Sequence, residues 1–410
     1  MYLLQFAVII LACAACGHIA ERIGQCRVVG EITAGILLGP SILGSLAPAF
    51  RNFLFPAATA TGMAQLGEFG IVLFMFETGM HLRMPQSGTR SGFGAAGSVA
   101  ALGLIVPFIL GCGAAWWSKT TLAPDVSTVP YVLFCGIALA VSAVPVMVRI
   151  IRDLGLEKNG LARTALAAAM MTDVAGWILL AAVASIAHAD KGALGAVGSL
   201  MAIAAYSLGC LLVTRYVVRP MLARVAANDE LHAGFIIVIC YVMASAWLTT
   251  SLGFHSAFGA LLPGMLLRNE PVVRDQWDKR FGPFIRTLLL PVFFSYAGIH
   301  TSIASITGYS AWMWFFVFLG VGFIGKFGGA YSAARFCGLA PNEAVFIGSL
   351  MNARGLMELI VLSIGLQLGI LPARVYTIFV FFALVTTAMT TPLLRYLMRP
   401  AKLALANPQR

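Results

Sequence analysis

The chain has 410 residues, of which 60% are hydrophobic and only 10% are charged, and its mean hydropathy is +0.90. A soluble domain carries about 25% charged residues, so this composition excludes an ordinary soluble protein and predicts an integral membrane protein. The formal net charge is +11, but the basic residues are spread over short segments between apolar windows, so no nucleic-acid partner is expected.

Apolar windows of roughly 20 residues, the length that crosses a bilayer core, recur along the whole chain. The first, "MYLLQFAVIILACAACG", has no Lys or Arg ahead of it, so we predict a transmembrane helix rather than a signal peptide. The ninth is short and contains Pro263 and Gly264. About thirteen helices are predicted in total, at residues 2–21, 28–46, 62–82, 93–117, 130–150, 161–187, 195–218, 232–251, 254–268, 281–300, 309–335, 342–368 and 374–398.

The placement of Lys and Arg predicts the orientation, because cytoplasmic loops carry an excess of basic residues. With the N-terminus outside and the C-terminus in the cytoplasm, the only basic residues left on the outer side are Arg51, Lys119, Lys191 and Arg374. We therefore expect a multi-pass protein of the cell (inner or cytoplasmic) membrane. Residues 1–410 are expected to form one transmembrane domain with no soluble regulatory domain.

Charges inside the predicted helices are costly and therefore indicate function. They are Glu31, Glu68, Glu77, Asp173, Lys326, Arg354 and Glu358. Asp173, in "MMTDVAG", lies about halfway along its helix, and Thr172 precedes it. A buried carboxylate can be poised so that a proton and a monovalent metal ion compete for its oxygens, and the Thr172 hydroxyl is a candidate second ligand. A protonated carboxyl that bonds a neighbour is the structural alternative.

Lys326, in "FIGKFGGAYSAARF", is flanked by glycines that allow close helix approach. Its ammonium needs a carboxylate partner or a neutral state, and a structural tether is as plausible as direct ion contact. Pro145, in "LAVSAVPVMVRI", removes a backbone donor and clashes with the carbonyl of Val141. This predicts a break in the fifth helix, where free carbonyls and the Ser142 hydroxyl could face a cavity.

A second break is predicted in the twelfth helix, in "GSLMNARGLMELIVL". Asn352, Arg354 and Gly355 stand in mid-helix, and Glu358 follows Arg354 at the i, i+4 spacing that favours an ion pair. The two interrupted helices occupy comparable places in the two halves of the chain. Paired interruptions of this kind indicate a midplane ion site in a transporter built from inverted repeats.

Several motifs resemble the monovalent cation/proton antiporter family, especially its Kef-type and NapA-type branches. They are "VVGEITAGILLGPSILG" (28–44), "FGIVLFMFETGMHL" (69–82), "MMTDVAGWILLA" and "GSLMNARGLMELIVLSIGL" (348–366). The resemblance covers about residues 5–398. It implies an all-α NapA/NhaA-like fold of thirteen helices with inverted repeats and two crossing discontinuous helices. It also implies a homodimer with interleaved dimerisation and core helices, and elevator-type alternating access.

The resemblance also assigns roles to individual residues. Asp173 matches the essential ion-binding aspartate, so the metal-binding prediction for Na⁺ or K⁺ is Asp173 with Thr172. Lys326 matches the core lysine that pairs with acidic residues. The other matched positions lie in the first crossing helix, Ser142 and Pro145, and in the second, Asn352, Arg354 and Glu358.

Two positions depart from the family pattern. Electrogenic members have Asp where this chain has Thr172, so one carboxylate fewer predicts electroneutral exchange of one proton per cation. The third helix ends in "GMH", with Glu77 one turn before His81. These two residues are a candidate pH-responsive pair, since His titrates near neutral pH; a loop-edge histidine without such a role is the alternative.

The predicted function is secondary antiport of protons against Na⁺ or K⁺, with a role in pH homeostasis. The partners are monovalent cations, protons and the lipid bilayer, and no cofactor is expected. One alternative is a Kef-like potassium efflux channel, although the sequence has no "TVGYG"-like filter. Another is an antiporter-derived exporter of a larger organic cation or ionophore. An enzyme is not expected, because no helix carries a nucleophile–base motif or a metal-ligand cluster.

Overall fold

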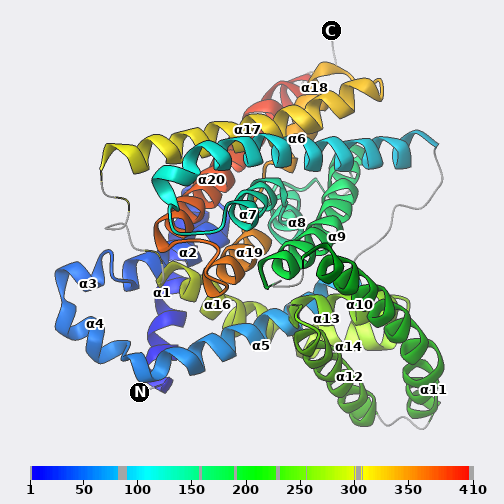
Figure 1. The fold of residues 1–410 in the computed structure, drawn as a ribbon. Coiled ribbons are helices and arrows are strands. Elements are labelled where there is room, and N and C mark those ends of the chain that lie inside the picture. Colours follow the sequence, from blue (N-terminus) through cyan, green and yellow to red (C-terminus); the bar gives the residue numbers. More distant parts are fainter. Residues whose placement is uncertain are drawn as a thin grey trace. The chain divides into compact units, whose positions relative to one another are not determined.

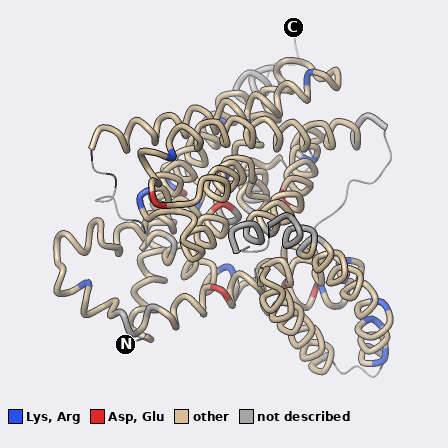
Figure 2. Tube along the Cα trace, in the orientation of Figure 1, with Lys and Arg blue, Asp and Glu red and all other residues tan. Residues whose placement is uncertain are grey.

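A computed structural model describes residues 2–81, 90–156, 159–188, 192–227, 231–254, 256–299, 301, 306 and 308–405. Across these residues the chain is almost entirely helical and contains no strand (Figure 1). Figure 2 shows how sparse charged residues are along the trace. Helices predominate because backbone N–H and C=O groups in a bilayer must pair within their own segment. The predicted all-α polytopic class is confirmed.

Each of the predicted windows coincides with one or more helices. In the described part of the chain, eight helical segments are long and apolar enough to cross a membrane: Tyr2–Arg22, Arg27–Leu46, Gly94–Leu122, Gly160–Leu180, Met201–Val225, His232–Ser251, Tyr309–Phe336 and Ala373–Met398. Shorter apolar helices are Thr128–Ala140, Ser256–Leu267 and Glu358–Gln367. The count of thirteen crossings and the inverted repeats stay predictions.

The chain divides into two compact units that alternate along the sequence. Unit 1 comprises Met1–Ile10, Asn52–Arg83 and Ala181–Tyr296. Its elements are α5 (Ala57–His81), α10 (Gly192–Val213), η1 (Thr214–Val218), α11 (Arg219–Ala227), α12 (Leu231–Ser251), α13 (Ser256–Leu267), α14 (Pro271–Arg280), α15 (Gly282–Phe284) and η2 (Ile285–Leu289), with the start of α1 (Tyr2–Arg22) and most of α16 (Leu290–Ile299). The two η segments are single π-helical stretches.

Unit 2 comprises Leu11–Arg51, Met84–Leu180 and Ala297–Arg410. Its elements are α2 (Arg27–Leu38), α3 (Leu43–Leu46), α4 (Pro48–Leu54) up to Arg51, α6 (Arg90–Leu122), α7 (Thr128–Ala140), α8 (Val144–Asp153), most of α9 (Gly160–His188), α17 (Tyr309–Phe336), α18 (Pro341–Met351), α19 (Leu356–Gln367) and α20 (Ala373–Leu405). Unit 2 contains both interrupted helices, α7–α8 and α18–α19, so it holds the predicted site.

Glycines allow α6 and α17 to pack closely within unit 2 (Figure 1). A Cβ added to Gly325 would lie 2.9 Å from the Cα of Pro107 on α6. Lys326 is the next residue on α17, and its side chain is fully buried. The glycines that the sequence places around Lys326 therefore serve the expected purpose, because a small residue lets two backbones approach and brings the lysine deep into the unit.

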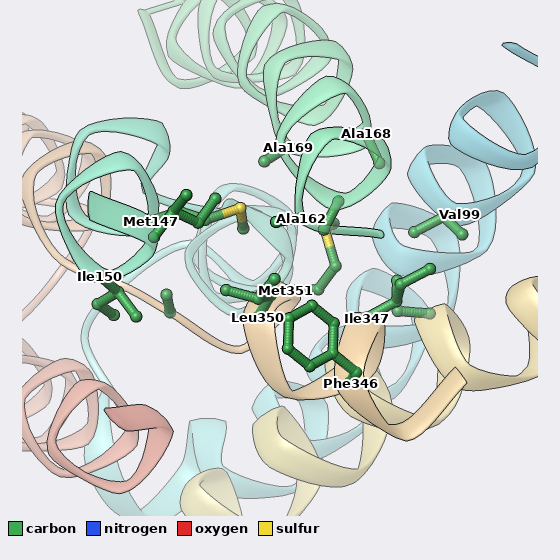
Figure 3. Packing of buried hydrophobic residues seen from close by; sticks show 14 of the residues in the cluster. Val99, Met147, Ile150, Ala162, Ala168, Ala169, Phe346, Ile347, Leu350 and Met351 are labelled. Atoms are coloured by element: carbon green, nitrogen blue, oxygen red, sulfur yellow. The ribbon is translucent and has the colours of Figure 1, made fainter. Parts of the chain in front are cut away.

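A hydrophobic cluster joins α8, α9 and α18 to α6 (Figure 3). Met147 of α8, Ala169 of α9 and Met351 of α18 are all buried within it. Ala169 stands one turn before Thr172, and Met351 is the last residue of α18 before the second break. The close packing of the cluster therefore fixes the helix ends that position the candidate site.

Candidate cation-binding site

The site forms where two interrupted helices meet. The first interruption, Val141–Ala143, separates α7 from α8, and the second, Asn352–Gly355, separates α18 from α19. The Ala143 N–H donates to the Ala353 carbonyl, with an N···O distance of 3.3 Å. The predicted pair of crossing discontinuous helices is thus confirmed. Broken helices are tolerated at membrane depth where protein groups or a cavity replace the lost backbone bonds.

Pro145 and Gly355 lie next to the interruptions in different ways. Pro145 stands in the first turn of α8, where its missing N–H would have had no helical acceptor. Gly355 is the residue before α19 and has φ 154° and ψ −113°, a conformation that L side chains rarely adopt. A Cβ at Gly355 would also come 2.7 Å from Cγ2 of Val146. Glycine is therefore required there by both conformation and space.

Asp173 of α9 faces the first interruption. Its carboxylate accepts a hydrogen bond from the backbone N–H of Val144, the first residue of α8. Its side chain is buried, and among the residues that the structure describes Oδ1 has no hydrogen-bond partner. A carboxylate at a helix N-terminus is favoured by the positive end of the helix dipole. One oxygen of Asp173 is thus held in place while the other remains open to a proton or a cation.

Two hydroxyls lie near this carboxylate. Thr172 precedes Asp173 in the sequence, and Ser142 lies in the first interruption. Thr172 Oγ1 is 3.2 Å from Ser142 Oγ and 2.8 Å from the Ala169 carbonyl oxygen, and both side chains are buried. The structure therefore brings together Asp173, Thr172 and Ser142, three of the predicted ligands, around residues 141–144. Carboxylate and hydroxyl oxygens are the hard ligands that alkali cations require.

Two buried basic side chains bond the carbonyls at the end of α7. The guanidinium of Arg354 donates to the carbonyls of Ala138 and Leu139, at 3.0 and 2.6 Å, and the ammonium of Lys326 donates to the carbonyl of Ala140. These carbonyls belong to the last turn of α7, where no helical N–H reaches them. The negative end of the α7 dipole is thus occupied by the protein's own basic side chains, and Lys326 acts as a tether within electrostatic reach of Asp173.

Arg354 and Glu358 form the ion pair that their spacing predicts. Arg354 NH1 lies 3.8 Å from Glu358 Oε2, and both side chains are buried. The guanidinium also stacks on the ring of Phe382, 4.5 Å from its centroid, and donates to the Gly322 carbonyl at 3.4 Å. Glu358 stands in the first turn of α19, where a negative charge is stabilised by the positive end of the helix dipole. Four elements therefore hold Arg354 in place.

Asn352 is the first residue after α18, and its side chain is buried. Neither its amide nitrogen nor its amide oxygen has a hydrogen-bond partner in the described ranges of the chain. A buried polar group in this condition is uncommon and calls for an explanation. The residue lies at the second interruption, as predicted, but no contact joins it to Asp173.

Glu77 and His81 do not form the predicted side-chain pair. The carboxylate of Glu77 pairs with Arg286 of η2. The ring of His81 instead contacts Asp278 of α14, with Nε2 3.0 Å from Oδ2, and its Nδ1 lies 2.8 Å from the Glu77 backbone carbonyl. Arg286 takes the carboxylate because the fold brings η2 against α5, which the local i, i+4 spacing does not reveal.

Comparison with known proteins places the chain in a family. The model of the transmembrane sodium/hydrogen exchanger family matches residues 7–398. The chain therefore belongs to this family of monovalent cation/proton antiporters.

Individual relatives agree with this placement. The chain is 33% identical over 397 residues to the Na(+)/H(+) antiporter NhaS4 of Synechocystis, with 96% of each protein covered. It is 30% identical over 403 residues to Cation/H(+) antiporter 17 of Arabidopsis thaliana, covering 98% of this chain and 49% of that one. The chain thus spans about half the length of this plant relative.

A solved structure has a similar fold. The sodium proton antiporter MjNhaP1 from Methanocaldococcus jannaschii matches with a TM-score of 0.67 and 14% identity, over 98% of this chain and 97% of that one. At this identity the likeness concerns the fold alone. It agrees with the all-α architecture described above.

Sequence reasoning missed the groups that come from backbone and from distant helices. The Val144 N–H bonds Asp173 and the hydroxyl of Thr387 on α20 bonds Arg354. The free carbonyls at the end of α7 were predicted to face a cavity, but Arg354 and Lys326 bond them instead. Only Thr387 had a sequence signal, the polar run "TTAMTT" (386–391) in an apolar helix. The other contacts depend on where the helices end and cross.

Proposed function

We propose that the chain is a secondary active antiporter that exchanges protons for Na⁺ or K⁺ at Asp173. The observation that carries this proposal is the buried Oδ1 of Asp173, which lies beside the interruption that holds Ser142 and lacks a hydrogen-bond partner within the described part of the chain. A proton or a cation can satisfy this oxygen, and binding of one removes the negative charge that attracts the other. Competition of this kind couples the two fluxes in opposite directions.

The neutral residue before Asp173 supports a one-to-one exchange. Thr172 contributes a hydroxyl that contacts Ser142 and Ala169, so it can coordinate a cation but carries no proton to exchange. Of positions 172 and 173, only Asp173 then carries a carboxylate, and one proton leaves it for each cation that binds. The resulting cycle moves no net charge across the membrane.

Elevator-type alternating access requires one body that carries the ion and one that stays fixed. We assign the carrying role to unit 2, which holds Asp173 and both interruptions, and the fixed role to unit 1. A homodimer through unit 1 is part of the same proposal. The relatives are named as antiporters, so a potassium channel and an exporter of larger organic cations are not favoured.

Exposed aromatic residues support the placement of two helix ends at one membrane surface, whichever side that surface faces. Trp116 and Trp117 are exposed near the end of α6, and Tyr309 and Trp312 are exposed at the start of α17. The two helices pack antiparallel, since Leu102 faces Gly329. Such aromatic groups favour the membrane–water interface, and the proposed topology puts both of these helix ends on the outer side.

The test is Asp173→Asn in proteoliposomes that contain a pH dye. We expect cation-driven proton movement to be abolished while the purified protein stays monodisperse, because an amide cannot bind and release the proton. Asp275→Asn, which changes an exposed carboxylate elsewhere, is the control and should retain exchange. A potential-sensitive dye should report no net charge movement in the wild type. Undiminished exchange by Asp173→Asn would refute the assignment.

A further inference from the structure

The hydroxyl of Thr387 on α20 bonds both backbone groups of one residue in the second interruption. Thr387 Oγ1 donates to the Arg354 carbonyl at 2.6 Å and accepts from the Arg354 N–H at 3.2 Å. Both residues are buried, Thr387 with 3% of its surface exposed and Arg354 with none. A single hydroxyl has one proton and two lone pairs, so it can make both bonds at once.

Neighbouring threonines of α20 behave differently. Thr386 donates to the Phe382 carbonyl at 2.8 Å and Thr390 donates to the Thr386 carbonyl at 2.9 Å. Both hydroxyls therefore bond within their own helix, as threonine commonly does in an apolar helix. Thr387 instead reaches across to α18–α19, so its position has a tertiary role that these two residues lack.

The two hydrogen bonds of Thr387 replace the helical backbone hydrogen bonds that the second interruption removes. Arg354 lies outside both α18 and α19, so its N–H and C=O have no helical partners, and an unpaired backbone group in a bilayer costs several kcal/mol. The same helix supplies Phe382, whose ring lies under the Arg354 guanidinium. Helix α20 thus holds both the backbone and the side chain of Arg354.

Arg354, whose backbone bonds Thr387, is next to Ala353, the residue that links the second interruption to the first. Ala353, the residue before Arg354, accepts the hydrogen bond from Ala143. Ala143 lies between Ser142, which contacts Thr172, and Val144, which donates to Asp173. A rotation of the Arg354 backbone would therefore move the Ala353 carbonyl. Through the hydrogen bond to Ala143, it would also shift the groups that surround Asp173.

We propose that Thr387 is a positioning residue for cation exchange, which fixes the second interruption so that the first presents its groups to the ion. The inference rests on the proposed function of Asp173 but makes a separate prediction about the backbone. Thr387→Val keeps the shape and removes the hydroxyl. We expect the apparent KM for the cation to rise about tenfold with a smaller change in maximal rate, because the helices remain but the ligands are misplaced.

The experiment combines proteoliposome kinetics with hydrogen exchange of the full-length protein. In Thr387→Val the Arg354 amide should exchange at least about tenfold faster than in the wild type, because it loses its acceptor. Thr387→Ser should restore both the hydrogen-exchange protection of the Arg354 amide and the apparent KM for the cation. Thr390→Val removes an equally buried hydroxyl that bonds only within α20, so it is the matched control and should leave both values within about twofold.

The outcomes separate this inference from the proposed function. If the Arg354 amide loses its hydrogen-exchange protection in Thr387→Val but the KM for the cation is unchanged, the positioning role is overturned. Equal effects of Thr387→Val and Thr390→Val would overturn it too. Unchanged exchange protection would show that the backbone bonds do not hold the interruption. If Thr387→Val cannot be purified, Thr387→Cys, with its weaker hydrogen bonds, should show intermediate values. Failure of the proposed function appears instead as wild-type vesicles without cation-driven proton movement, whatever Thr387 does.

Discussion

Units 1 and 2 hold the charges of their membrane-embedded helices in different ways. In unit 1 the buried carboxylate of Glu77 pairs with Arg286, whose side chain is 50% exposed, and the His81–Asp278 contact is 45% and 35% exposed. In unit 2 the Arg354–Glu358 pair is 0% and 1% exposed. These contacts of unit 1 thus lie partly at the protein surface, as does the Arg27–Glu31 pair of unit 2, whereas the Arg354–Glu358 pair of unit 2 is enclosed by helix ends inside the protein.

This difference teaches what a buried charge needs. Two opposite charges alone do not repay the loss of water, so a buried pair is stable only if further hydrogen bonds satisfy its remaining groups. The carbonyls of Ala138, Leu139 and Gly322 do this for Arg354. The carbonyls of Ala138 and Leu139 are free to accept because α7 ends at Ala140, so the broken helix and the buried arginine support each other.

The largest difference between the units should come from removing an arginine from each. Arg354→Gln leaves Glu358 and the carbonyls at the end of α7 without their buried cation, and we expect a loss of about 3–5 kcal/mol in stability. Arg219→Gln in unit 1 removes a partner of Glu270 and of the Leu266 carbonyl, but both charged side chains are partly exposed. That loss should be at most about 1 kcal/mol.

Thermal unfolding in one detergent at a single pH measures both variants. Arg354→Gln combined with Glu358→Gln should recover part of the loss, because the second change removes the uncompensated buried carboxylate. Equal midpoints for Arg354→Gln and Arg219→Gln would contradict the contrast between the units.

A smaller effect is expected at Glu77. Arg286→Ala leaves a carboxylate that is 7% exposed without its ion pair, and we expect a loss of about 1–3 kcal/mol. The loss is smaller than for Arg354 because unit 1 can admit water at this helix end. Arg286→Lys retains the charge and should recover most of the midpoint, and an Arg286→Ala protein as stable as the wild type would show that Glu77 is already solvated.

The smallest effect on stability is expected at His81, which we propose as the pH-responsive group of this cluster. His81→Gln keeps a donor toward Asp278, so unfolding should change by less than about 1 kcal/mol. The ring contacts the Asp278 carboxylate and the Glu77 backbone carbonyl, and the Glu77 carboxylate pairs with Arg286. Exchange rates measured from about pH 5.5 to about pH 8.5 should lose part of their pH dependence in His81→Gln. An identical profile would remove the sensing role.

Several features of this molecule could be predicted from the sequence because they depend on local chemistry. Apolar length predicted the helices, Pro145 and Gly355 predicted the two interruptions, and the i, i+4 spacing predicted the Arg354–Glu358 pair. The same local reasoning failed for Glu77 and His81, because their spacing allows a pair but Arg286 and Asp278, about 200 residues away in the chain, compete for the same groups.

The sequence by itself therefore determined the membrane class, the family and the residues that carry charge into the helices. The tertiary structure alone decided which helix ends meet, and so which backbone groups face Asp173, Lys326 and Arg354. The physical reason is that an interruption exposes N–H and C=O groups whose partners can come from any helix nearby. Thr387 shows this most clearly, because nothing in its own helix indicates that it bonds the backbone of Arg354.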